Sequence, residues 1–158
     1  MQYTLEGKIK NKPLVEIYID NLCRSLKLDR RCASELDIKF VTRLEGNCLG
    51  LACGGPRWGE IEIAKTSEGV KISFMNQMLA LAHEMIHIKQ YMKGEMTDEP
   101  RTVWKGQDHE STPYTQQPWE IEANELEYEL FAKNYLVVLL SFDDFPLRSL
   151  AIKHLLII

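Results

Sequence analysis

The sequence contains no apolar run long enough to cross a bilayer. Its longest strongly apolar stretch, residues 135–140, is far shorter than the roughly 20 residues that a transmembrane helix needs. Residues 1–12 are polar and have no apolar central region, so they lack the pattern of a secretory signal peptide. We therefore expect a cytoplasmic protein that has no membrane partner.

The chain also lacks an excess of positive charge. Lys and Arg number 19 and Asp and Glu number 23, which gives a formal net charge of −4. Proteins that bind nucleic acid usually present a basic surface. We therefore expect no nucleic-acid partner.

Cysteine is scarce, and its spacing matches no common metal motif. None of the four cysteines (Cys23, Cys32, Cys48 and Cys53) belongs to a Cys-x-x-Cys pair. In a protein expected in the cytoplasm, this spacing favours reduced, mostly buried thiols over disulfides or a cysteine-ligated zinc.

Length and apolar periodicity predict one α+β domain that spans residues 1–158. Helices are expected at residues 13–28, 74–93, 118–140 and 146–158, strands at 37–43 and 58–65, a short strand or lead-in at 70–73, and irregular chain at 50–56 and 95–117. We expect a small mixed or antiparallel sheet packed on the first helix and on the helix at 74–93. The helix at 118–140 follows them in the chain.

A His-Glu-x-x-His motif, formed by His83, Glu84 and His87, lies in the middle of the helix expected at residues 74–93. Residues four apart share one face of a helix, so both imidazoles can reach one metal ion. Glu84 is placed to act on a water molecule without binding the metal. Two histidines spaced by chance are the alternative, but only four histidines occur in the chain. The motif therefore predicts a zinc (Zn²⁺) site, and Gln90 on the same face is expected to support it or to face substrate.

A catalytic zinc site needs a third protein ligand. A histidine soon after His87 is excluded, because residues 91–97 contain none. The remaining candidates are Glu120, Glu122 and His109.

We favour Glu120 as the third ligand. Asn124 lies four residues later on the same helical face, with the small Ala123 beside it. From there Asn124 could hydrogen-bond the far nitrogen of His83 and fix its tautomer. Glu122 is expected to be solvated, although acidic residues in a first helical turn also suit the helix dipole.

These two motifs together resemble the gluzincin group of metallopeptidases, which pair His-Glu-x-x-His with a glutamate on a later helix. The sequence Glu120-x-x-x-Asn124 matches this glutamate and the Asp or Asn that often follows it four residues later. The Ala123-Asn124 pair is similar to the Glu-x-x-Ala-Asn/Asp pattern of ImmA-type and membrane CAAX-type peptidases. The strings around both motifs also resemble those of small uncharacterised phage and bacterial metallopeptidases. The resemblance covers about residues 58–136 and implies a minimal zincin-like fold without the second domain of large gluzincins.

The resemblance implies zinc-dependent hydrolysis of peptide bonds, as an endopeptidase acting on a protein or peptide substrate. His83, His87 and Glu120 would bind the zinc, which polarises the scissile carbonyl and lowers the pKa of the attacking water. Glu84 would take the proton from that water as general base and pass it to the leaving amine.

Two further features are expected to contact the substrate. His109 or Tyr114 could donate a hydrogen bond to the developing oxyanion. The strand at residues 58–64 would be an exposed edge that pairs with an extended peptide, although a plain amphipathic strand has the same pattern.

The alternative function is a catalytically silent zinc-binding module with a regulatory or interaction role. The presence of Glu84 argues against it, because a structural site needs no general base.

Overall fold

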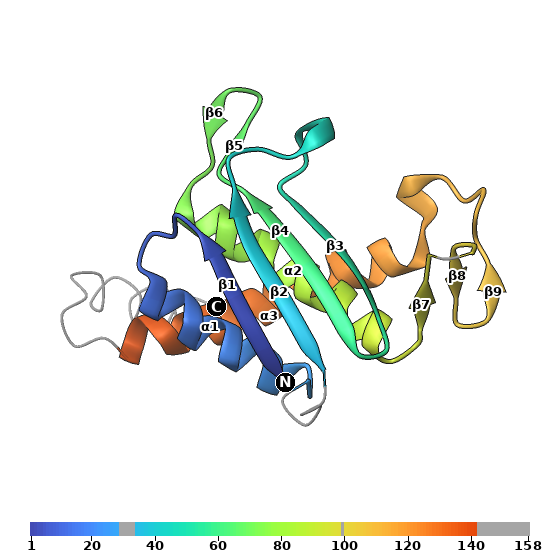
Figure 1. Ribbon diagram of the computed structural model, residues 1–158, viewed down its shortest axis with the longest axis horizontal. Helices are drawn as coiled ribbons and strands as arrows, with labels where there is room; N and C mark the ends of the chain where they lie inside the picture. The colour runs from blue at the N-terminus through green and yellow to red at the C-terminus, as the bar shows by residue number, and fades with distance from the viewer. Residues whose placement is uncertain (29–33, 99, 142–158) are drawn as a thin grey trace.

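The computed structural model of the protein describes residues 1–28, 34–98 and 100–141. It has a mixed α+β architecture in which a four-stranded sheet is backed by helices on one side (Figure 1). The closing helix expected at residues 146–158 lies outside the described residues. Within the described part of the chain, no helix combines the length and the apolar character that a membrane crossing requires.

The sheet has the order β1-β2-β4-β3 and is mixed. Strands β1 (Gln2–Gly7), β2 (Glu35–Val41) and β4 (Trp58–Ala64) are parallel, and β3 (Gly50–Gly55) runs antiparallel to β4. Side chains on β2 and β4 alternate between the helices and solvent, as the period of two in their sequences predicts. The sheet is therefore mixed, as expected.

Three longer helices lie in the described part of the chain: α1 (Lys12–Ser25), α2 (Phe74–Met92) and α3 (Pro118–Ser141). Pro13 lies in the first turn of α1, where its missing N–H has no intrahelical partner to lose. After α2, Gly94 adopts a left-handed backbone with φ of 68°, a conformation that ends helices. The three helices predicted in these regions are confirmed, and none of their ends is shifted by more than three residues.

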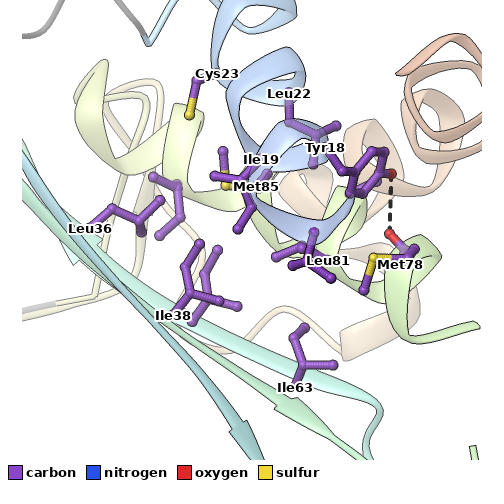
Figure 2. Close-up of a cluster of buried hydrophobic side chains, with 14 of the residues drawn as sticks. Tyr18, Ile19, Leu22, Cys23, Leu36, Ile38, Ile63, Met78, Leu81 and Met85 are labelled. Carbon is purple, nitrogen blue, oxygen red and sulfur yellow. Dashed lines mark hydrogen bonds between the residues drawn. The ribbon is translucent and has the colours of Figure 1, made fainter. Parts of the chain in front are cut away.

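One hydrophobic core joins α1, α2 and the inner face of the sheet. Figure 2 shows Leu81 and Met85 of α2 lying between side chains of the sheet, such as Ile38 and Ile63, and the side chains of α1. The hydroxyl of Tyr18 is buried there and donates a hydrogen bond to the backbone oxygen of Met78, at 3.2 Å. The burial of this face fixes α2 against the sheet.

Three expectations about strands were wrong. Strand β1 lies in a segment for which no strand was expected, and the segment expected to be irregular at residues 50–56 contains β3. Strand β4 is not an edge, because β2 pairs on one side of it and β3 on the other. Among the described strands, β3 is an outer strand, and it lies beside α2.

Smaller elements fill the remaining segments. A two-stranded hairpin, β5 (Thr66–Ser67) and β6 (Val70–Lys71), connects β4 to α2. The segment expected to be irregular at residues 95–117 contains three two-residue strands, β7 (Met96–Thr97), β8 (Val103–Trp104) and β9 (Gln107–Asp108). Short 3₁₀ turns lie at η1 (Glu45–Asn47) and η2 (Tyr114–Gln116).

The cysteines are more exposed than the sequence predicted. Cys23 is buried, but Cys48 and Cys53, before and within β3, are both exposed. Among the described residues, none of these three forms a disulfide. The expectation of mostly buried thiols is therefore wrong for these three cysteines.

Candidate metal centre

Two histidines of α2 and one glutamate of α3 converge on a common point. The Nε2 atoms of His83 and His87 lie 3.1 Å apart. The carboxylate of Glu120, in the first turn of α3, lies 3.4 Å from Nε2 of His83 and 3.3 Å from Nε2 of His87. One possible ligand atom from each of the three residues lies within 4.8 Å of the others, so the group could hold a metal ion.

The other ring nitrogen of His83 is held by a carboxylate. Its Nδ1 lies 2.9 Å from Oε2 of Glu127, two turns after Glu120 on α3. A carboxylate at this distance accepts a hydrogen bond, so it favours the tautomer of His83 that carries its proton on Nδ1. In that tautomer, Nε2 presents a lone pair.

The Nδ1 atom of His87 is also held by a hydrogen-bond acceptor, here the side-chain amide of Gln90. This nitrogen lies 2.8 Å from Oε1 of Gln90. The amide nitrogen of Gln90 donates to the backbone oxygen of Trp119 at 3.2 Å and to Oε2 of Glu122 at 2.7 Å. Because both of those partners are acceptors, the amide oxygen must face His87, and Nδ1 of His87 must be the donor.

With both Nδ1 atoms donating, the neutral rings direct two Nε2 lone pairs and the oxygens of Glu120 at one another. Such an arrangement is repulsive unless a cation lies among them, either a proton or a metal. Tetrahedral zinc ligands at about 2.0–2.1 Å from the metal are separated from one another by about 3.3–3.4 Å. The observed separations of 3.1, 3.3 and 3.4 Å fit that arrangement.

The electrostatics of the three residues also favour a positive charge. Burial lowers the pKa of His83, but its hydrogen bonds to Glu120 and Glu127 and the charge of Glu84 outweigh this and raise it to about 9. The pKa of His87 is raised in the same way, against its own burial. Burial opposes ionisation of Glu120, yet the hydrogen bonds from the two histidines hold its pKa well below the usual range.

Glu84 is buried next to the three converging residues, with 7% of its surface exposed. Burial raises its pKa to about 7, although the neighbouring histidines His87 and His83 oppose this shift. Its side chain lies against Gly50 of β3, where an added Cβ atom would come within 2.5 Å of Oε1. Glycine at position 50 therefore leaves the space that the Glu84 carboxylate occupies.

Two adjoining hollows open onto these residues. A hollow of about 200 Å³ is lined by His83, Glu84, His87 and Glu120 together with β3, and a second of about 510 Å³ adjoins it at His83 and Glu84. Tyr114 lines both, and its hydroxyl donates to Oε2 of Glu120 at 2.9 Å. The candidate centre is thus accessible from the side of β3.

The structure corrects the expected role of Asn124. This side chain is exposed and lines the larger hollow, whereas the far nitrogen of His83 faces Glu127. Residues 120, 124 and 127 share one helical face, so the sequence signal for Glu127 was as good as that for Asn124. The way α3 packs against α2 places Glu127, and not Asn124, next to Nδ1 of His83.

The two alternative ligands lie outside the converging group. Nδ1 of His109 lies 3.1 Å from Oγ1 of Thr112, and its ring packs edge-on against Trp119. Glu122 is not simply solvated, because it accepts a hydrogen bond from Gln90 and lies 3.5 Å from Nζ of Lys89. Gln90 was expected either to support the site or to face substrate. It lies behind His87 and accepts a hydrogen bond from its Nδ1 atom, which agrees with the supporting role.

The chain was compared with protein-family models, with curated proteins and with solved structures, and none of these comparisons finds a match.

Proposed function

We propose that the protein is a zinc-dependent peptidase of the gluzincin type, with a zincin-like fold, that hydrolyses peptide bonds in protein or peptide substrates. One observation carries the proposal. Both histidines of the His-Glu-x-x-His motif donate their Nδ1 protons to fixed acceptors, and their Nε2 atoms converge with Glu120. Histidines that bind metals typically donate their other nitrogen in this way.

Zinc is the metal of this proposal, because two histidines in the His-Glu-x-x-His spacing on one helix are typical of catalytic zinc sites. Two imidazole nitrogens and one carboxylate oxygen form a ligand set found in catalytic zinc sites, which keep a further position open. A zinc ion held there would polarise a substrate carbonyl and lower the pKa of a water molecule. The hollow lined by β3 is where the substrate would enter.

Glu84 is the general base in this proposal. Its carboxylate lies in the same hollow as the converging ligand atoms but is not one of them. A carboxylate oxygen of Glu84 would accept the proton of the attacking water and return it to the leaving amine. Its confinement against Gly50 limits the positions that this oxygen can take.

Strand β3 is the proposed docking edge for the substrate, in place of the inner strand β4. It pairs only with β4 among the described strands and lies beside α2. Gly50, Leu51 and Ala52 line the hollow together with the histidines. An extended peptide that added to this edge would place its backbone next to the candidate centre.

The proposal is tested by measuring bound zinc and proteolysis together. Wild-type protein should carry one zinc per chain by mass spectrometry and should cleave casein or a peptide library. Glu84→Gln should retain the zinc and lose about 10²–10⁴-fold in cleavage rate, the usual contribution of a general base. Glu120→Ala should lose the zinc, whereas Glu125→Ala, an exposed change on the same helix, should leave both properties unchanged.

Two results would overturn the proposal. Wild-type protein that binds no zinc would leave the convergence of His83, His87 and Glu120 without a metal. Zinc binding without cleavage across a broad library would instead favour a silent zinc-binding module. Loss of zinc in Glu125→Ala would show that the effect of Glu120→Ala is not local.

A further inference from the structure

A separate hollow of about 670 Å³ lies at the N-terminal end of α2. Four lysines from three segments line it: Lys8 and Lys10 after β1, Lys65 after β4, and Lys71 in β6. We call it the lysine pocket. It shares no lining residue with the hollows at the candidate metal centre.

Acidic side chains are missing from the walls of the lysine pocket, as far as the structure describes the chain. No carboxylate of the described residues lines it or forms an ion pair with any of its four lysines. Elsewhere lysines are paired: Lys39 with Glu60, and Lys89 and Lys105 with Glu122. In a chain with a formal net charge of −4, four unpaired ammonium groups around one hollow create a local field that attracts anions.

A second lysine-lined hollow in the same protein provides a contrast. It has a volume of about 290 Å³ and is lined by Lys27, Lys89, Lys93 and Lys133. There, however, Glu129 also lines the wall, and Lys89 is paired with Glu122. The absence of lining acids among the described residues is therefore a feature of the lysine pocket, and not of every lysine-lined hollow in this chain.

The backbone around the lysine pocket adds to the positive field. Parallel strands β1, β2 and β4 all point toward the end of the sheet at which the β5–β6 hairpin lies (Figure 1). Helix α1 begins shortly after β1, and α2 begins after the hairpin, so both helix N-termini lie at this end. Helix N-termini carry a partial positive charge, and ligands of open α/β sheets commonly bind beyond the carboxyl ends of parallel strands.

The lysine pocket also has an apolar part. Ile9, Ile72 and Phe74 line it, and Ile72 is buried beneath it. The buried Gln77 side chain is held there by a hydrogen bond from its Nε2 atom to the backbone oxygen of Ile72, at 2.9 Å. A ligand with a charged group and a carbon body would match both parts.

We propose that the lysine pocket binds a small phosphate-bearing molecule. Lysine ammonium groups bind phosphate oxygens as point charges, and the field of two helix N-termini favours the same negative charge. The ligand would lie apart from the metal centre, since Gln77 and His83 are separated by about 9 Å along α2 at a rise of 1.5 Å per residue. The inference therefore does not depend on the proposed peptidase activity.

Calorimetric titration with inorganic pyrophosphate at low ionic strength tests this inference on the full chain with its metal. We expect one pyrophosphate to bind per chain. The triple variant Lys8→Gln/Lys65→Gln/Lys71→Gln should weaken binding by at least about tenfold. The control Lys27→Gln/Lys93→Gln/Lys133→Gln changes the net charge by the same amount at the other hollow and should alter binding by less than about twofold.

Several results would overturn the inference. They are the absence of pyrophosphate binding to wild type, unchanged binding in the first triple variant, and equal weakening in both. Unchanged binding would place the anion elsewhere, for example on the metal. Citrate that binds as tightly as pyrophosphate would overturn the assignment to phosphate. If the first triple variant does not fold, Lys71→Gln alone gives the same test with a smaller loss, because Lys71 is exposed on the hairpin.

Discussion

The two faces of α2 are buried in different ways. Toward α1 and the sheet, the helix presents apolar side chains such as Leu81 and Met85, which pack without directional partners (Figure 2). Toward α3, it presents His83, His87 and Gln90, each held by a hydrogen bond. The comparison teaches that the apolar face needs only volume and apolar area, whereas each buried polar group on the other face needs its own partner. Substitutions on the two faces should therefore affect different properties.

The largest effect is expected on the apolar face, for Leu81→Ala. Leu81 is fully buried, and truncation of a buried leucine costs about 2–5 kcal/mol of unfolding free energy because it leaves a cavity. Urea unfolding of the metal-free protein measures this loss. Leu51→Ala, at a side chain that is 55% exposed, should stay within about 0.5 kcal/mol of wild type. If Leu81→Ala folded but bound less zinc than the wild type does, the effects of the two faces would not be separable.

On the polar face, the largest effect is expected for Gln90→Leu. The change removes the acceptor that fixes Nδ1 of His87 and leaves Glu122 without its amide donor. Loss of such a partner behind a ligand typically weakens metal binding by about 10–100-fold. Competition with a zinc chelator measures the affinity.

Gln77→Leu is the matched control for this substitution. Gln77 is a second buried glutamine of α2, but it bonds the backbone of Ile72 and lines the lysine pocket, which shares no residue with the hollows at the candidate metal centre. Its loss should lower stability and leave the zinc affinity within about threefold. Equal losses of zinc affinity in both variants would mean that any buried polar change on α2 disturbs the site.

A smaller effect is expected for Glu127→Gln. The glutamine keeps an oxygen that can accept from Nδ1 of His83 but removes the negative charge. Zinc affinity should therefore fall by about tenfold or less, near the lower end of the range for partners behind a ligand. The control Glu129→Gln makes the same change at an exposed site on α3 and should have no measurable effect. A loss as large as that of Gln90→Leu would show that charge matters more than orientation here.

Apolar burial follows a regular period that can be read from the sequence, whereas a specific contact between two residues does not. This difference explains which parts of the fold could be predicted. Apolar periodicity identified α1, β2 and β4, because each buries a regular stripe or face. Strand β3 was missed because its glycines lower strand propensity. In the fold those glycines have a reason, since Gly50 makes room for Glu84 and a Cβ atom at Gly54 would come within 2.9 Å of the backbone of Trp58. The approach of Gly50 to Glu84 is tertiary, so it leaves no local period in the sequence.

The candidate site was predictable where it depends on spacing within one helix. The pair His83 and His87 follows from helical geometry, and the chemistry of zinc pointed to Glu120 as the third member of the group. The partner of His83 depends instead on how α2 and α3 approach each other. Asn124 and Glu127 both lie on the face of Glu120, and only the packed pair of helices places Glu127 at Nδ1 of His83.

The smallest effect is expected at the exposed rim of the candidate centre, in η2, for Tyr114→Phe. The phenol donates to Oε2 of Glu120, but the side chain is 65% exposed. Water can therefore replace the lost hydroxyl, and zinc affinity should fall by less than about fivefold. Tyr128→Phe removes a hydroxyl from a similarly exposed residue of the adjoining hollow, 64% exposed, and should have no effect on zinc affinity. A loss of zinc affinity of about 10-fold or more in Tyr114→Phe would mean that water does not substitute for the phenol. Residues at the exposed rim of the α2–α3 contact would then need a direct partner, as the buried residues do.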